Sequence, residues 1–337
     1  MKKKKWVLLK ILFIFLPIFV FMFSIGIGRY TITPYEVVLS IIQAITKNDM
    51  GISLEIFTVV IEIRMQRVFL GAVVGAALAA SGTAFQSLFR NPLVSGGILG
   101  VSSGAGFGAA LSIVLYNSVF MTPVFAFSFG ILAVVLSYFA GKIENTSPVI
   151  TMVLGGTIIQ SVFSALVSLL KYVADPNTEL PAITFWLMGS LASTKSSDFL
   201  LSCIPMVVGI LGLLGFRYRL NVLSMGDKEA KTLGINVVTN KLAVIVFATL
   251  ATAGAVCVSG VVGWVGLIIP HVARIFVGND NRYLLPASLS FGACFMMICD
   301  VICRTLTAGE IPLGIVTALV GGPFFIYLLK KTKGRNW

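Results

Sequence analysis

Long apolar runs recur along the whole chain, and no other feature constrains its fold as strongly. Between polar or Gly/Pro breaks, they approach the roughly 20 residues that a helix needs to cross a bilayer. Because backbone groups inside lipid must be satisfied within the chain, such runs predict helices. With 57% hydrophobic and 11% charged residues among 337, the chain also has too little polar surface to coat a water-soluble globule. The predicted fold class is all-α, a polytopic membrane protein.

Ten of these runs are candidate spans, and the polar stretches between them are too short for a soluble domain. We therefore expect a single transmembrane domain over residues 1–337. The first run follows Lys2 to Lys5 as a secretory signal would, but it is longer than a signal core and lacks an A-x-A-like site, so we expect a retained span. The predicted spans lie near residues 11–28, 68–88, 93–116, 123–141, 148–172, 198–216, 241–258, 261–278, 285–304 and 311–329.

Lysine and arginine are distributed unevenly among the segments that join the spans. Since positive charge favours the cytoplasmic side, an even number of spans with basic ends places both termini in the cytoplasm. Cationic segments beside anionic lipid also explain the net charge of +12 without a nucleic acid partner. Only seven of the 25 basic residues fall in segments predicted to face outwards, namely Arg29, Lys47, Arg64, Arg67, Lys171, Lys195 and Arg304.

Glycine recurs at four-residue intervals in the third predicted span. On a helix, this spacing makes a flat stripe that a neighbouring helix can approach closely, and two further glycines offer a second such surface. We expect helix packing at both, with a pathway-lining or hinge role as the alternative. The glycines concerned are Gly96, Gly100, Gly104 and Gly108 in the stripe, and Gly71 and Gly75 in the second surface.

A polar segment, residues 217–240, separates the sixth and seventh predicted spans on the cytoplasmic side. The residues at its centre predict a short soluble helix, since Asp227 and Glu229 suit the positive N-terminal end and Lys231 suits the last turn. Gly234 can adopt the left-handed conformation that closes a helix. The segment is either a solvated linker on the membrane or a docking element for a cytoplasmic partner. The docking candidates are Leu223, Ser224, Met225, Gly226, Asp227, Glu229, Ala230, Leu233 and Gly234.

Three arginines stand at predicted outer ends of spans, where positive charge is otherwise sparse. Arg64 and Arg67 precede the second span, and Arg304 ends the ninth. They either anchor the interface by snorkelling or form a basic docking site for an acidic external partner. Asp300 lies four residues before Arg304 on the same helix and is positioned to pair with it.

Residues that carry chemistry are sparse. His271 is the single histidine and cannot form a metal site alone; we expect a structural role beside Pro270, whose ring frees a backbone carbonyl for Arg or His. The sequence holds no nucleophile motif and no G-x-x-x-x-G-K-[ST] phosphate loop. We therefore predict no metal, no cofactor and no catalysis by this chain. Five cysteines lie in apolar stretches without C-x-x-C spacing, namely Cys203, Cys257, Cys294, Cys299 and Cys303.

Ordered motifs along nearly the whole chain resemble those of the FecCD family of ABC-importer permeases, which serves iron-siderophores, haem and vitamin B12. Gln66 departs from the family's usual proline, which bears on the local turn more than on the charges. The motifs are Arg64 to Arg67, Gly75 to Gly82 with Gln86, Arg90 to Leu93, Gly97 to Gly104, Trp186 to Leu191, Leu223 to Asp227 with Ala230 to Gly234, Gly266 to His271, Asp280 to Pro286, Ile311 to Thr317 and Gly322 to Phe324.

The resemblance implies a type II ABC importer permease in the bacterial inner membrane. A second permease subunit, two cytoplasmic ATPases that bind the ATP, and an extracytoplasmic substrate-binding protein would complete it. The segment Leu223 to Gly234 corresponds to the coupling loop that docks on the ATPase. Arg64, Arg67 and Arg304 correspond to arginines that meet acidic residues of the binding protein.

The resemblance favours an iron-siderophore as cargo, imported by alternating access. Haem and cobalamin stay open as alternative chelates, and so do a homodimer and a heterodimer of permeases. The main rival is an ion-coupled secondary transporter, which would need ionisable groups inside the spans. Asp300 is the one plausible deep carboxylate, and it has Arg304 beside it.

Overall fold

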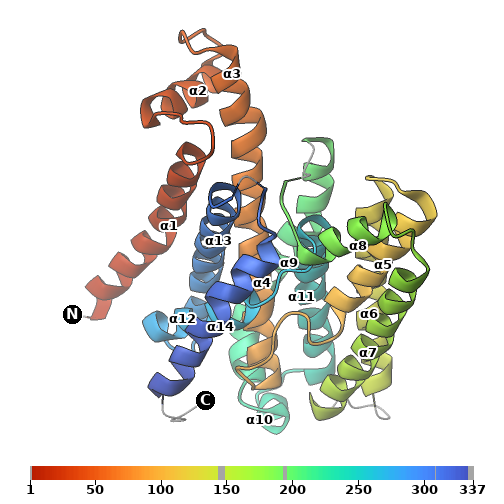
Figure 1. The fold of residues 1–337 in the computed structure, drawn as a ribbon. Coiled ribbons are helices and arrows are strands. Elements are labelled where there is room, and N and C mark those ends of the chain that lie inside the picture. The colour runs from red at the N-terminus through yellow and green to blue at the C-terminus, as the bar shows by residue number, and fades with distance from the viewer. Residues whose placement is uncertain (1, 143–148, 193–195, 308, 333–337) are drawn as a thin grey trace.

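The computed structural model describes residues 2–142, 149–192, 196–307 and 309–332, which fold into helices without strands (Figure 1). The all-α prediction is confirmed. The helices are α1 (Lys2–Gly26), α2 (Pro34–Thr46), α3 (Leu54–Phe57), the π-helical stretch Thr58–Met65, α4 (Gln66–Phe89), α5 (Val101–Tyr116), α6 (Met121–Gly141), α7 (Val149–Val173), α8 (Glu179–Met188), α9 (Ser196–Leu223), α10 (Asp227–Thr232), α11 (Val237–Ser259), α12 (Val265–Val277), α13 (Asn281–Thr305) and α14 (Leu313–Thr332).

Each of the ten predicted spans overlaps one of these helices. Within the described residues, six helices are long and apolar enough to cross a membrane, and shorter apolar helices occupy the remaining predicted spans. The shorter ones include Val101–Tyr116 and Val265–Val277.

Several helices are longer or shorter than the spans predicted for them. The helix that carries the second predicted span begins at Leu54, not near residue 68, because α3, the π-helical stretch and α4 form one continuous helix of 36 residues. At about 1.5 Å per residue this helix is longer than the roughly 30 Å hydrocarbon layer, so it continues into the polar region with its charged residues. The helix of the third predicted span begins at Val101, because Arg90 adopts a left-handed conformation and the chain turns before entering α5. The predicted loop 217–240 is shorter, since α9 extends to Leu223 and α11 begins at Val237.

Helix α4 forms the centre of the molecule (Figure 1), and α9, α11, α12 and α13 pack around it. Small residues make this possible. A Cβ on Gly75 would lie 2.1 Å from the carbonyl oxygen of Gly292 in α13, and a Cβ on Gly82 would lie 1.9 Å from that of Gly266 in α12. The backbones of α4, α12 and α13 therefore meet directly, as helices in membranes do at glycine.

The two ends of the molecule differ in what they carry. The start of α1, the end of α14 and α10 lie in the lower half of Figure 1, and α2 and α3 lie at the opposite end. Helices α5, α6 and α7 pack beside one another on the side away from α1. We call the two ends the α10 end and the α2 end.

Candidate functional site

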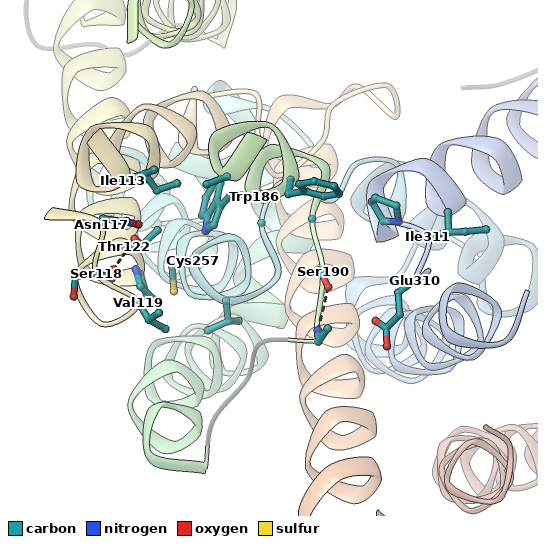
Figure 2. Close-up of a pocket in the computed structure, with 18 residues that line it drawn as sticks. Ile113, Asn117, Ser118, Val119, Thr122, Trp186, Ser190, Cys257, Glu310 and Ile311 are labelled. Carbon is teal, nitrogen blue, oxygen red and sulfur yellow. Dashed lines mark hydrogen bonds between the residues drawn. The ribbon is translucent and has the colours of Figure 1, made fainter. Parts of the chain in front are cut away.

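A cavity of about 460 Å³ opens among α5, α6, α8, the end of α11 and the segment before α14. Figure 2 shows Asn117, Ser118 and Thr122 on one side of it and Glu310 and Ile311 on the other. Its walls are otherwise neutral or apolar. The lining residues are Ile113, Asn117, Ser118, Val119, Thr122, Pro123, Ala182, Phe185, Trp186, Gly189, Ser190, Ala192, Cys257, Val258, Gly260, Glu310, Ile311 and Pro312.

Three connections come together to form the floor of this cavity. The amide of Leu313 donates to the carbonyl of Gly189 at 2.9 Å, and the amide of Ser190 donates to the carbonyl of Ser259 at 2.9 Å. Gly189 and Gly260 have φ angles of +78° and +67°, which favour glycine. A Cβ on Gly260 would also lie 2.4 Å from the carbonyl oxygen of residue 186. Only glycine lets these segments cross so closely.

Among the described residues, Glu310 is the single charged residue of the lining, and it is paired with Arg67. The two terminal nitrogens of Arg67 donate to the two carboxylate oxygens of Glu310 at 2.8 and 2.9 Å. These hydrogen bonds lower the pKa of Glu310, which lies between α13 and α14, below its ordinary value. The bidentate pair is a strong form of charge-assisted hydrogen bond and leaves the wall without a free charge.

The same arginine reaches a second carboxylate deeper in the molecule. The Nε of Arg67 donates to Oδ1 of Asp300 at 2.8 Å, and the other oxygen of Asp300 lies 3.3 Å from Nε of Arg304. The predicted pairing of Asp300 with Arg304 is confirmed as an ion-pair contact. The Asp300 side chain has no exposed surface, so two neighbouring arginines compensate its buried charge.

Arg64 and Arg304 have a further role, because they cap the end of α1. The last carbonyls of a helix have no partner within it. Here Arg304 donates to the carbonyl of Ser24, and Arg64 donates to those of Ile25 and Gly26 at 3.0 and 3.2 Å. Positive charge at a helix C-terminus is also favoured by the helix dipole.

The expectation of three outward-facing arginines is therefore corrected. Arg64 and Arg304 are only 5% and 6% exposed, and the Arg67 side chain is 12% exposed. They lie inside the helix packing at the α2 end because the backbone and carboxylate partners that compensate their charge are there. Whether a binding protein docks at this end stays a prediction.

The predicted glycine stripe is only half helical. Gly96 and Gly100 precede α5, and Gly100 has a φ angle of +83° that helps the chain turn into the helix. Gly104 and Gly108 do lie in α5, where a Cβ would come within 2.4 and 2.3 Å of carbonyl oxygens of α6. In α4, a Cβ on Gly71 would meet the Leu191 side chain at 3.3 Å. None of the glycines predicted for packing or the pathway lines the cavity described above.

At the α10 end, the predicted short helix is present. Gly226 precedes it with a φ angle of +134°, and Gly234 follows it with a φ angle of +76°. The amide of Gly234 bonds to the carbonyl of Lys231, and that of Ile235 bonds to the carbonyl of Ala230, which is the Schellman closure. The predicted left-handed closure at Gly234 is thus confirmed.

The side chains of α10 and of the residues that flank it divide into two sets. Leu223 and Ala230 are 1% and 0% exposed and pack into the core with α11, so they turn away from any partner and are corrected as contact residues. Met225 and Leu233 are 60% and 59% exposed. Asp227 receives a 2.7 Å bond from the buried Lys241, which fastens α10 to α11.

Comparison with known proteins decides the family. The chain matches the FecCD transport family over residues 15–331. It is 40% identical to the molybdate import system permease protein MolB of Haemophilus influenzae, covering 92% of this chain and 91% of that protein. It is 39% identical to a probable iron chelatin transport system permease protein of Helicobacter pylori, covering 89% and 90%. The chain belongs to the FecCD transport family.

Solved structures and further relatives agree with this membership. A chain from the inward-facing conformation of a metal-chelate type ABC transporter superposes with a TM-score of 0.84 at 35% identity, covering 98% of this chain and all of that one. The hemin transport system permease protein HmuU of Yersinia pestis is 38% identical, covering 81% and 83%. The protein is thus a multi-pass ABC importer permease of the FecCD family.

Two FecCD motifs meet at this cavity. Trp186 and Gly189 come from one, and Ile311 and Pro312 come from the other, although more than 100 residues separate them. Considered alone, neither motif indicated a cavity, and residues such as Glu310 carried no signal. The signal that could have located the cavity is that two separate family motifs supply residues of its lining.

Proline in α12 gives a second example of a partner that sequence reasoning missed. Pro270 lacks the amide that would bond to the carbonyl of Gly266. We expected Arg or His to satisfy that carbonyl, but Nε2 of Gln86 in α4 donates to it at 3.3 Å. Arg274 instead donates to Oε1 of Gln86 at 2.6 Å. Gln86 itself belongs to a FecCD motif.

Proposed function

We propose that this FecCD permease carries an intact metal chelate into the cytoplasm, with an iron-siderophore as the favoured cargo and haem or cobalamin as alternatives. In this proposal, a second permease subunit completes the pathway. Separate ATPase subunits bind and hydrolyse the ATP, an extracytoplasmic protein delivers the cargo, and both termini lie in the cytoplasm. The iron chelatin and hemin permeases among the relatives support this class of cargo.

The observation that carries the proposal is the cavity near the α2 end. A bare metal cation prefers carboxylate, imidazole or thiolate ligands at fixed positions. The lining offers one carboxylate, Glu310, and Arg67 already occupies both of its oxygens. A chelate brings its own ligands and needs only a wide, weakly polar wall.

The ATPase would dock at the α10 end. Met225 and Leu233 present large apolar side chains there, and the exposed residues Lys228 and Glu229 add charge beside them. An exposed apolar pair with a polar surround is typical of a small protein–protein contact. The inward-facing Leu223 and Ala230 hold the helix in place behind this surface.

The binding protein would dock at the α2 end. Arg64, Arg67 and Arg304 would act there by fixing the end of α1 and the segment that carries Glu310, because their own side chains are largely covered. Exposed basic groups that remain at this end include Arg29. Such a contact would be sensitive to salt.

Uptake into proteoliposomes with the cognate binding protein and ATPase tests the cargo. Three substrates are compared: a ferric siderophore labelled on both metal and ligand, the free ferric ion, and molybdate. We expect the two labels of the siderophore to enter together and in equal amounts. Entry of the metal label alone, or entry of molybdate in place of the chelate, would overturn the cargo assignment but leave the permease assignment intact.

A further inference from the structure

Polar side chains join three helices at the α10 end. Oδ1 of Asn221 in α9 accepts from the backbone amide of Asn281, and Nδ2 of Asn221 donates to Oδ1 of Asp280, both at 2.7 Å. Ser87 in α4 donates to Oδ1 of Asn281 at 2.8 Å. Because a backbone amide can only donate, the orientation of the Asn221 amide is fixed. We call Ser87, Asn221, Asp280 and Asn281 the α10-end node.

The hydrogen bonds of the α10-end node are costly to break. Asn281 and Ser87 are 1% and 8% exposed, so a lost partner would leave a polar group buried without a hydrogen bond. Asp280 caps the start of α13 and accepts from Arg282 as well as Asn221. These bonds, that with Arg282 foremost, lower the pKa of Asp280 to about 2. Its carboxylate therefore stays charged at neutral pH and keeps accepting from Asn221.

Asn221 lies in the last turn of α9, directly before the segment that leads into α10. Leu223 and Ala230 are buried on either side of that segment. On its other side, α10 is tied to α11 through Asp227 and Lys241. A displacement of α10 therefore moves the end of α9, and with it Asn221.

The partner of Asn221 is one half of a tightly joined pair of helices. Helices α4 and α13 are linked at three heights: by Ser87 and Asn281 at the α10 end, by direct backbone contact of Gly75 and Gly292 in the middle, and by Arg67 and Asp300 at the α2 end. Arg67 also holds Glu310 in the cavity wall. Such a pair moves as a rigid body more readily than it bends.

We infer that Asn221 is a positioning residue that transmits movement of α10 to the α4 and α13 pair, and so to the cavity at the α2 end. The inference rests on the proposed docking of the ATPase at α10. Asn221 makes two hydrogen bonds to the N-terminal end of α13. Among the described residues, these bonds are the polar link between α9 and the α4 and α13 pair at the α10 end.

The first test measures cargo transported per ATP hydrolysed for Asn221→Ala in proteoliposomes. We expect ATPase binding and ATP hydrolysis to stay near the wild-type level while cargo per ATP falls about five- to tenfold, which lies within the usual range of coupling effects. Thr239→Ala is the matched control, because Thr239 is exposed at the same end and its side chain is not part of the node. An unchanged ratio in Asn221→Ala would overturn the inference.

The second test distinguishes lost coupling from poor folding. Asn221→Cys and Asn281→Cys are combined in a background whose five native cysteines are replaced by alanine and whose uptake is intact. We expect a low transport ratio before treatment, recovery on joining the two thiols with a short bis-methanethiosulfonate reagent, and loss again on reduction. If the link forms but cargo transported per ATP does not recover, the ends of α9 and α13 need not move together, and the inference is contradicted. If the wild type itself shows no ATP-driven uptake, the proposed function fails instead.

Discussion

At the residue scale, the arginines show why charge alone did not reveal their role. The sequence predicts Arg64 and Arg304 at the outer ends of spans, but it does not indicate which groups they bind. Arg64 bonds to a backbone carbonyl 39 positions away, and Arg304 bonds to one 280 positions away. Backbone groups have no signature in a sequence, so capping of this kind becomes visible only in the structure. The pairing of Asp300 with Arg304 was predictable because it is local.

The first prediction concerns the buried carboxylate. Asp300→Ala removes the partner of two largely buried arginines, so we expect the free energy of unfolding to fall by about 3–5 kcal/mol. Asp300→Asn keeps a polar side chain of the same shape and should cost less. Thermal unfolding of the purified protein in detergent measures both. A loss in Asp300→Ala no larger than that of an exposed alanine substitution would contradict the compensated-charge account.

Glu310 gives a pH-dependent prediction. Hydrogen bonds from Arg67 lower its pKa in the folded protein, so its ionised form is the stabilising one. Its contribution is then fully present above its ordinary value of 4.5 and is lost as the pH falls through the lower folded value. We expect wild type to be more stable than Glu310→Gln at neutral pH, with the difference shrinking below about pH 4. A difference that stays constant down to pH 3 would contradict this assignment.

At the element scale, the helices were predictable and several of their ends were not. Apolar runs located a helix in every predicted span, because lipid enforces helical backbone wherever such a run occurs. The start at Leu54 of the continuous helix that ends in α4 was missed, because charged residues near Arg64 end the hydropathy signal although the helix continues. The closure of α10 at Gly234 was predictable because its interactions lie within one turn. The inward orientation of Ala230 was not, because it depends on packing against distant helices.

The close contact of α4 with α13 gives a prediction about packing. Gly75→Ala places a Cβ 2.1 Å from a carbonyl oxygen of α13, so we expect a loss of about 1–3 kcal/mol or failure to fold. Gly215→Ala is the control, because Gly215 lies within α9 and a Cβ there meets nothing within 4 Å. It should be neutral or stabilising by up to about 1 kcal/mol. Similar melting temperatures for the two variants would argue against direct backbone contact.

The exposed pair at α10 gives a prediction about docking. Replacing Met225 and Leu233 by Asp puts charges into the proposed ATPase contact without disturbing the core, so we expect ATPase binding to weaken about tenfold or more. Protein yield and melting temperature should stay at the wild-type level, because both side chains are mostly exposed. Co-purification of the ATPase with the permease measures the effect. Undiminished co-purification would place the contact elsewhere.

At the scale of the whole molecule, the α2 end and the α10 end are joined by the closely packed helices α4 and α13. The short helix α10 lies at one end, α2 and α3 lie at the other, and α4 and α13 run between them (Figure 1). Arg67 with Asp300, Gly75 with Gly292 and Ser87 with Asn281 join α4 to α13 along their length. The described residues offer no group of three metal-ligating side chains. Asp300, the deep carboxylate that an ion-coupled carrier would need, is held between two arginines. The two ion pairs of Asp300 favour a subunit that draws its energy from another chain over an ion-coupled carrier.

The most direct test of this account is the energy source of uptake. The permease is reconstituted with its cognate ATPase and binding protein. Uptake of the labelled chelate is then measured with and without ATP, the ATPase chain and ion gradients. We predict uptake that requires both ATP and the ATPase, and that persists when proton and sodium gradients are dissipated. Uptake by the permease alone, driven by an ion gradient in the absence of the ATPase, would contradict it.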